Sequence, residues 1–217
     1  MSTESRKERV RKIIPPAVAV TGGVYILLAP SEPLVLSLFL KALPMFLIIA
    51  YAVLLLPDDG LRVQYLVVGG LIFCVVGDVT LHWFVVGLTA FLVGHVFYAV
   101  GFFTRARVTR LGLVSSVPFA VYALVVGTFL ITALLGDGDT ELVVPVAVYL
   151  AVVTTMAWSA VLTGNRRAVA GSLLFVASDT VLSWNMFVEP LPFSGAIVMV
   201  TYYSAQYLIA SSVERFG

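Results

Sequence analysis

The sequence predicts an all-α membrane protein, a polytopic bundle of eight transmembrane helices. Of the 217 residues, 60% are hydrophobic and only 12% are charged, whereas a soluble domain carries about 25% charged residues. The mean hydropathy is +1.05. Apolar runs of about 20 residues, the length that crosses a bilayer as a helix, recur along the chain. The predicted spans are 13–29, 34–56, 63–83, 85–103, 111–135, 142–163, 168–188 and 193–212.

Turn and charge signals separate these spans. In chain order they are Ala29 to Pro33, Pro57 to Gly60, the weak break at His82-Trp83, Arg105 to Arg110, Gly136 to Asp139, Gly164 to Arg167, and Glu189-Pro190. In the first span, Pro15-Pro16 predict a helix start, where a missing N–H is tolerated. No small-residue cleavage site follows a short apolar core, so this span is interpreted as retained rather than as a signal peptide.

The basic residues predict the orientation. If the N-terminus is cytoplasmic, 12 of the 13 Lys and Arg residues fall in cytoplasmic segments and none falls in an outer loop; Lys41 lies inside the second span. Cytoplasmic loops of membrane proteins carry this excess of positive charge. We therefore expect a multi-pass protein of the cell membrane, with a basic cytoplasmic N-terminus (1–12), an eight-helix domain (13–212) and a cytoplasmic C-terminus (213–217).

Two aspartates lie in similar apolar runs, Asp78 in LIFCVVGDVTL and Asp179 in SLLFVASDTVL. A shift of 101 residues aligns them and also aligns Leu81 with Leu182 and Trp83 with Trp184. This pattern hints at a 4+4 tandem repeat, although three identities leave chance alignment open. A carboxylate in hydrocarbon is costly unless it faces protein, water or a partner, and the pair is interpreted as the acid–base pair of an intramembrane enzyme.

Further polar side chains lie at similar depths in other spans, which predicts one cavity shared with the aspartates. They are Lys41, His95 with Tyr98 on the same helix face, Tyr202, Tyr203 and Gln206. Structural roles stay open for each: Lys41 could fix packing through an ion pair with Asp78, His95 and the tyrosines could make interhelical hydrogen bonds, and Asn185 could cap its helix.

Several chemistries find no support in the sequence. The single Cys74 excludes an intrachain disulfide and a cysteine metal cluster. No basic stripe interleaved with aromatic residues points to nucleic acid. Neither G-x-S-x-G nor H-E-x-x-H occurs. We expect no metal and no cofactor, with His95 and both aspartates left open as a hard-metal site, and paired carboxylates remain the route to hydrolysis.

An ordered set of motifs over residues 34–212 resembles the YhhN-like lysoplasmalogenase family. These motifs are Lys41-Ala-Leu-Pro-Met, Gly77-Asp78 followed by Leu81, Phe91-Leu-Val-Gly-His95-Val-Phe-Tyr98, Ser178-Asp179 with Leu182 and Asn185, and Thr201-Tyr-Tyr-Ser-Ala-Gln206. Family members commonly have proline directly after the lysine, whereas Ala42 and Leu43 intervene here. The resemblance implies an eight-helix enzyme that hydrolyses the vinyl ether bond of lysoplasmalogens to a fatty aldehyde and a glycerophospho-alcohol.

In the mechanism that we expect, one neutral aspartate protonates the vinyl ether and the other, ionised, stabilises the cation and steers water. The sequence leaves open which of the two aspartates is neutral and which is ionised. The predicted catalytic residues are Asp78, Asp179 and His95, and the predicted substrate-binding residues are Lys41, Tyr98, Asn185, Tyr202, Tyr203 and Gln206. The expected partners are a lysophospholipid and membrane lipids. The alternative is a proton-coupled transporter of small molecules or lipids; a structural or lipid-binding protein is a third candidate.

Overall fold

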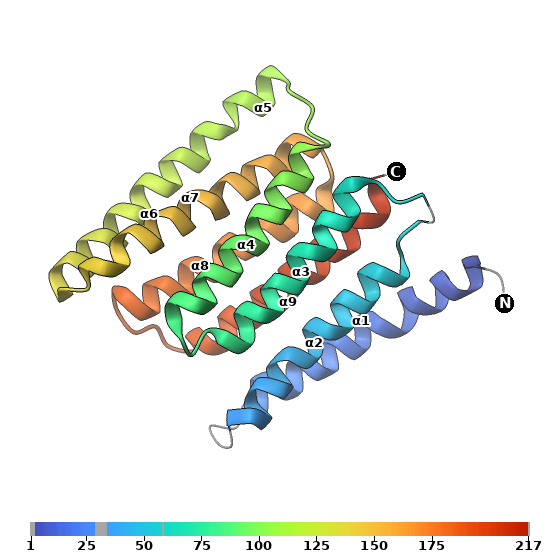
Figure 1. The fold of residues 1–217 in the computed structure, drawn as a ribbon, viewed down its shortest axis with the longest axis horizontal. Coiled ribbons are helices and arrows are strands. Elements are labelled where there is room, and N and C mark those ends of the chain that lie inside the picture. The colour runs from blue at the N-terminus through green and yellow to red at the C-terminus, as the bar shows by residue number, and fades with distance from the viewer. Residues whose placement is uncertain (1–2, 29–33, 58, 217) are drawn as a thin grey trace.

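The computed structural model describes residues 3–28, 34–57 and 59–216. The predicted break at 29–33 therefore lies outside the described residues, and so does Asp58 within the predicted break at 57–60. The described chain is helical throughout, with short connections (Figure 1). Its elements are α1 (Thr3–Leu28), α2 (Leu34–Leu54), α3 (Arg62–Thr80), α4 (Phe84–Phe103), α5 (Arg110–Val114), α6 (Ser116–Asp137), α7 (Thr140–Thr163), α8 (Arg166–Phe187), α9 (Ser194–Ser212) and the 3₁₀ turn η1 (Val213–Arg215).

The eight predicted spans correspond to α1, α2, α3, α4, α5 with α6, α7, α8 and α9. In the described part of the chain, seven of these helices have the length and composition to cross a membrane. The eighth, α8, is 22 residues long and more polar, since it carries Arg166, Arg167 and Asp179. It packs against α6, α7 and α9 within the same bundle. The all-helical prediction is confirmed, and the chain is a multi-pass membrane protein.

The prediction for the start of the first helix is wrong. Helix α1 begins at Thr3, and Pro15 and Pro16 lie in its interior. Upstream of the prolines, the segment is rich in Glu, Lys and Arg, which favour helix, and it is held in place by Arg11, whose guanidinium lies 2.7 Å from the Glu214 carboxylate of η1. The helix therefore begins upstream of the first apolar run and includes the basic segment.

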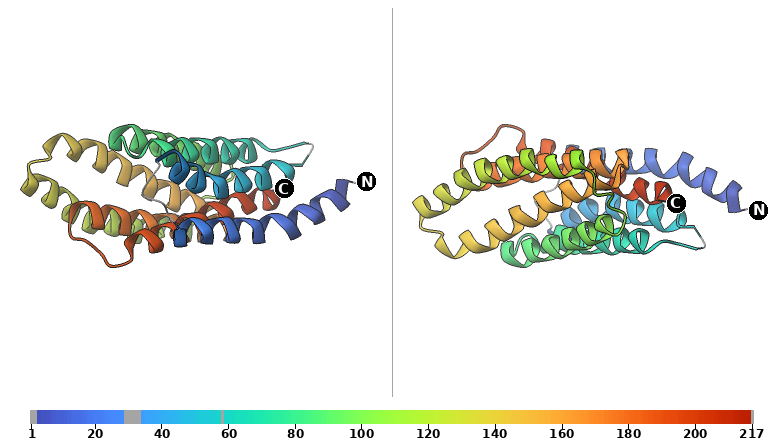
Figure 2. Two further views of the ribbon diagram at one scale, coloured as in Figure 1. Left: turned by 90° about the horizontal axis from the view of Figure 1, so that it is seen from below. Right: turned by 90° about the horizontal axis from the view of Figure 1, so that it is seen from above.

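The helices form a bundle whose packing repeats between the two halves of the chain (Figures 1 and 2). The third and fourth helices of each half pack closely together, α3 on α4 and α8 on α9. The second helix of each half crosses to the other half, with α2 against α9 and α7 against α4. Helices α1 and α2 flank one side of this central group, and α6 and α7 flank the other.

Two glycines, 101 residues apart, allow the close approach of α3 to α4 and of α8 to α9. A Cβ at Gly70 would lie 2.9 Å from the Gly94 carbonyl oxygen of α4, and one at Gly171 would lie 2.8 Å from the Ala205 carbonyl oxygen of α9. Real Cβ atoms essentially never approach backbone so closely. Both interfaces therefore need glycine at the same register, which supports the predicted tandem repeat.

Two carboxamides with the same 101-residue separation hold the C-terminal segment. Gln64, near the start of α3, donates from Nε2 to the Val213 carbonyl oxygen at 2.6 Å. Asn165, the N-cap of α8, donates from Nδ2 to the Ser212 carbonyl oxygen at 3.1 Å. Both contacts end on the same C-terminal segment, and together they fix the end of α9 between the starts of α3 and α8.

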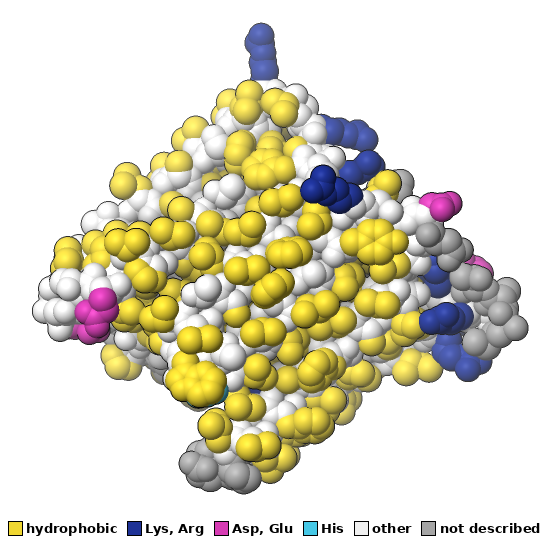
Figure 3. Space-filling model, viewed as in Figure 1, with side chains coloured by type: hydrophobic (Ala, Val, Ile, Leu, Met, Phe, Trp, Pro, Cys, Tyr) yellow, Lys and Arg dark blue, Asp and Glu magenta, His cyan; other side chains and the backbone are white. Residues whose placement is uncertain are grey.

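Charge is segregated along the bundle (Figure 3). Lys and Arg side chains gather along the edge that holds the start of α1, the C-terminus and α5, while hydrophobic side chains cover most of the visible face between the ends. Contacts of Glu214 with Arg11 at 2.7 Å and with Arg167 at 3.7 Å place the starts of α1 and α8 at this end together with η1. The two termini therefore share one end, and its cytoplasmic orientation stays a prediction.

Candidate active site

Asp78 lies near the end of α3, is 3% exposed, and has two side-chain partners. Its Oδ1 lies 3.4 Å from Nζ of Lys41 on α2. Its Oδ2 accepts a hydrogen bond of 2.6 Å from the hydroxyl of Tyr202 on α9. Lys41 also donates to the main-chain oxygen of Asp78 at 3.3 Å, and the hydroxyl of Tyr203 donates to the main-chain oxygen of Lys41 at 2.8 Å. An ammonium and a phenol thus converge on this carboxyl group.

Asp179 on α8 has a different environment. Its Oδ2 accepts a hydrogen bond of 2.6 Å from the hydroxyl of Tyr149 on α7. In residues 3–28, 34–57 and 59–216, no Lys, Arg or His side chain pairs with its carboxyl group. On the following residue, the Thr180 hydroxyl lies 2.7 Å from the hydroxyl of Tyr122 on α6. Each aspartate therefore accepts a hydrogen bond from its own tyrosine, Tyr202 for Asp78 and Tyr149 for Asp179, but Asp78 alone of the two has a cationic partner among the described residues.

Both aspartates line one cavity of about 390 Å³. It lies at the end of the bundle opposite the basic edge, where α3, α6 and α8 end and α4, α7 and α9 begin. Lys41, Tyr149, Tyr202 and Asn185 also line it, and much of the remaining wall is apolar: Leu81, Phe84, Leu88, Phe91, Leu130, Val146 and Phe187. Both aspartates therefore line one common cavity, as expected for the third and seventh predicted spans, and their catalytic roles stay predictions.

His95, Tyr98 and Gln206 are fully buried beside the cavity and are not part of its lining. Nδ1 of His95 makes a 2.6 Å hydrogen bond with the Phe91 carbonyl oxygen, and Nε2 has no hydrogen-bond partner among the residues that the structure describes. The His95 ring packs edge-on against Phe175, with centroids 4.4 Å apart. Tyr98 donates to Oε1 of Gln206 at 2.7 Å. Their depth in the helices fits the cavity, but their helix faces turn into the packed core, and the roles given to them stay predictions.

The other two predicted binding residues have structural contacts. Tyr203 lies outside the cavity lining and contacts the site through its hydrogen bond to the Lys41 carbonyl oxygen and through the ring of Tyr202, with centroids 5.6 Å apart. Asn185 lines the cavity, and its Oδ1 accepts a hydrogen bond of 2.9 Å from the backbone of Leu191. This contact ties the loop after α8 to that helix, in line with the capping role that the sequence left open.

Three tyrosines of the cavity were not predicted, Tyr25, Tyr122 and Tyr149. Tyr149 is the most consequential because it contacts Asp179 directly. A detectable signal existed, since its hydroxyl lies within the apolar run VPVAVYLAVV, and a buried tyrosine hydroxyl usually needs a hydrogen-bond partner. In the described chain, no group of three or more His, Cys, Asp or Glu side chains could hold a metal ion.

Sequence comparison assigns the chain to a family. The sequence model of the YhhN family matches residues 36–213, a range that includes every predicted site residue from Lys41 to Gln206. The chain belongs to the YhhN family.

Relatives of this YhhN protein have a named activity. It is similar to human lysoplasmalogenase TMEM86A, with 34% identity over 227 residues that cover 94% of this chain and 89% of the relative. It is also similar to human lysoplasmalogenase TMEM86B, with 33% identity over 179 residues, 81% and 74% of the two chains. Rat lysoplasmalogenase TMEM86B is 31% identical over 211 residues, 95% and 86% of the two chains. No solved structure matches this YhhN protein significantly.

Proposed function

We propose that this YhhN protein is a lysoplasmalogenase, an intramembrane hydrolase that cleaves the vinyl ether bond of a lysoplasmalogen to a fatty aldehyde and a glycerophospho-alcohol. The observation that carries the proposal is the cavity of about 390 Å³ that both Asp78 and Asp179 line. The names of the relatives in human and rat support the same reaction. The apolar wall of the cavity suits the alkenyl chain of a lysophospholipid.

The different partners of the two carboxyl groups assign their roles in this proposal. Asp78 faces the Lys41 ammonium at 3.4 Å and accepts the Tyr202 hydrogen bond, and both contacts favour a carboxylate. Asp179 has the Tyr149 hydroxyl alone and no cation among the described residues. Asp179 is therefore the proton donor, and Asp78 is the anion.

The reaction then follows in balanced steps. The Asp179 carboxyl group gives its proton to the β-carbon of the vinyl ether, which becomes an oxocarbenium ion. The Asp78 carboxylate stabilises this cation and takes a proton from the water that adds to it. The hemiacetal then collapses: the C–O bond to the glycerol oxygen breaks, its electron pair and the hemiacetal hydroxyl proton go to that oxygen, and the aldehyde and the alcohol are released. One water is consumed for each bond cleaved, and the proton that Asp78 took from the water returns to Asp179 before the next turnover.

The membrane that holds the protein is also part of the proposal. The segregated basic edge supports a cell-membrane protein whose termini lie in the cytoplasm. The cavity would then lie in the outer half of the bilayer, and a lysophospholipid of that leaflet is the substrate expected to reach it.

The proposal is tested with purified Asp78→Asn and Asp179→Asn proteins and a panel of vinyl ether and ester lysolipids. Each variant should lose aldehyde release by at least about 100-fold, the usual contribution of a general acid or base, and remain folded. Ester lysolipids should not be cleaved. In D₂O, aldehyde trapped at once by reduction should carry one deuterium on the carbon beside the former carbonyl. Near-native turnover by either variant, or aldehyde without deuterium, would contradict the mechanism.

A further inference from the structure

A second cavity lies at the opposite end of the bundle from the two aspartates. It has a volume of about 700 Å³ and is enclosed by the connection between α4 and α6, the end of α7 and the C-terminal residues. Three arginines line it, Arg105, Arg107 and Arg215, and no Asp or Glu does. The other polar lining residues are Thr and Ser hydroxyls and Asn165.

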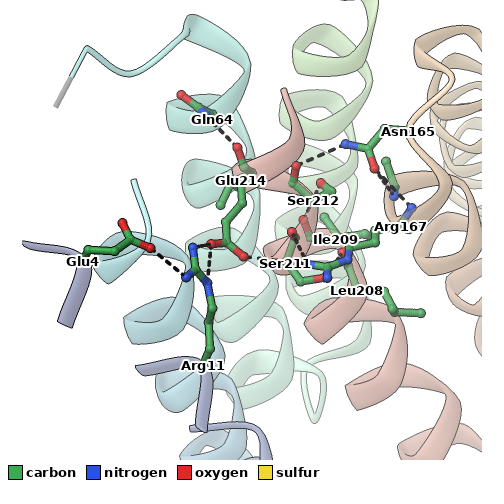
Figure 4. A network of polar contacts seen from close by, with 12 residues as sticks. Glu4, Arg11, Gln64, Asn165, Arg167, Leu208, Ile209, Ser211, Ser212 and Glu214 are labelled. Carbon is green, nitrogen blue, oxygen red and sulfur yellow. Dashed lines mark hydrogen bonds and ion pairs between the residues drawn. The ribbon is translucent and has the colours of Figure 1, made fainter. Parts of the chain in front are cut away.

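These three arginines are without a neutralising partner in the described parts of the chain. All three are exposed, and none lies within ion-pairing distance of a carboxylate. The acid next to Arg215 in sequence, Glu214, turns to the other side of η1, where it binds Arg11 at 2.7 Å and lies 3.7 Å from Arg167 (Figure 4). The cavity therefore holds three positive charges and is complementary to an anion.

The framework of the cavity is fixed by contacts that do not involve the arginine side chains. The backbone N–H of Arg107 donates to the Leu162 carbonyl oxygen at 2.9 Å. The indole of Trp158 donates to the Gly112 carbonyl oxygen at 3.0 Å. Phe216, 4% exposed, packs on the core of the bundle and anchors the segment that carries Arg215. The arginines can thus be replaced without removing what shapes the cavity.

A row of exposed apolar side chains lies beside the arginines. Leu111, which lines the cavity, is 81% exposed, Val108 is 72% exposed and Val114 is 64% exposed. Leu111 and Val114 lie in the first turns of the stretch Arg110–Asp137, which has the length and composition to cross a membrane, and Val108 lies just before it. Such a helix end is expected at the level of the lipid headgroups. A free phosphate ion would use the charges and leave this apolar row unused, whereas a phospholipid would use both.

We propose that this cavity binds an anionic phospholipid, with its phosphate among Arg105, Arg107 and Arg215 and its acyl chains along Val108 and Leu111. Guanidinium groups bind phosphate through paired hydrogen bonds, and basic pockets between transmembrane helices bind anionic headgroups. The site lies apart from the two aspartates and does not depend on the proposed reaction.

Native mass spectrometry of the purified full-length protein tests the site, with dioleoyl phosphatidylglycerol against dioleoyl phosphatidylcholine as probes. The wild-type protein should retain the anionic lipid in preference to the zwitterionic one. Each Arg→Gln change should weaken its binding about fivefold, the effect of one basic side chain at a membrane surface, and Arg105→Gln/Arg107→Gln/Arg215→Gln should weaken it about a hundredfold.

The matched control, Arg6→Gln/Arg9→Gln/Arg62→Gln, removes the same charge from exposed positions at the same end and should leave the preference unchanged. Val108→Ser/Leu111→Ser keeps every arginine and should weaken binding of the dioleoyl lipid but not of its dihexanoyl analogue. Circular dichroism establishes that each variant is folded. Equal loss in the control and the triple variant, equal retention of both lipids, or displacement of the lipid by millimolar inorganic phosphate would overturn the proposal.

Discussion

Replacement of Lys41 by methionine tests the division of labour between the aspartates. The Lys41 ammonium lies 3.4 Å from Oδ1 of Asp78, and the two side chains are 15% and 2% exposed. At that separation, and with an effective dielectric constant of about 20, the attraction is about 5 kcal/mol before desolvation is counted. Removal of one member of a buried pair typically costs about 3–5 kcal/mol. We expect Lys41→Met to lower the free energy of unfolding by about 3 kcal/mol, near the lower end of this range, because Lys41 borders a cavity.

The assay pairs thermal unfolding in a mild detergent with aldehyde release from a vinyl ether lysolipid. Lys41→Met should lower the unfolding temperature and strongly reduce turnover, because the Asp78 carboxylate loses its cation. Lys41→Met/Asp78→Asn removes both charges and should recover much of the stability but no activity. If Lys41→Met alone keeps wild-type stability and turnover, the ion pair fixes neither the fold nor the charge of Asp78, and the assigned roles lose their basis.

Three further predictions follow from the same contacts. Tyr202→Phe should reduce turnover about 10- to 100-fold, because it removes a hydrogen bond to the charged Asp78. Tyr149→Phe should reduce turnover less than about tenfold, because its partner Asp179 is neutral in the proposed mechanism. The reverse order in kcat would contradict the roles assigned to the two aspartates. Gly171→Ala should destabilise the protein by about 1–3 kcal/mol, since its Cβ would lie 2.8 Å from a backbone oxygen of α9, and Gly23→Ala, with open space around it, serves as the control in thermal unfolding. Leu130→Trp should fill the apolar part of the cavity and reduce cleavage of long-chain more than of short-chain substrates; an equal effect on both would place the alkenyl chain elsewhere.

Much of the fold could be predicted because hydrophobic length and turn chemistry are local properties. The end of α6 at Asp137 and that of α7 at Thr163 follow from Gly138 and Gly164, which take left-handed conformations just after them. The start of α1 could not be predicted in this way. Pro15 and Pro16 look like a beginning, but the preceding turns are stabilised by Arg11 and its contact with Glu214, 203 residues away.

The candidate site was only partly predictable, because depth in a helix can be counted along the sequence and rotation about its axis cannot. Asp78, Asp179, Lys41 and Tyr202 meet at one cavity, as expected. His95 has a suitable depth, yet its ring turns towards Phe175 in the core. Apolar residues surround every face of these helices, on the lipid side and in the core alike, so hydrophobicity gives little information about which face a polar residue shares with the cavity.

The tandem arrangement supplies the reason why two similar aspartates can differ in function. In each half, the third helix carries the aspartate and the second helix of the same half reaches it, through Lys41 for Asp78 and through Tyr149 for Asp179. A perfectly repeated pair would have equivalent carboxyl groups, and neither would be set to hold a proton while the other held a charge. Lys41 on α2 faces Asp78 and Tyr149 on α7 faces Asp179, at positions 108 rather than 101 residues apart, so the two carboxyl groups are not equivalent. In the proposed mechanism, this difference between the partners on α2 and α7 separates the proton donor from the anion. Tyr149→Lys in an otherwise unchanged protein should therefore abolish turnover although it adds a charge that Asp179 could pair with, and retained activity in that variant would show that the asymmetry is not what the reaction needs.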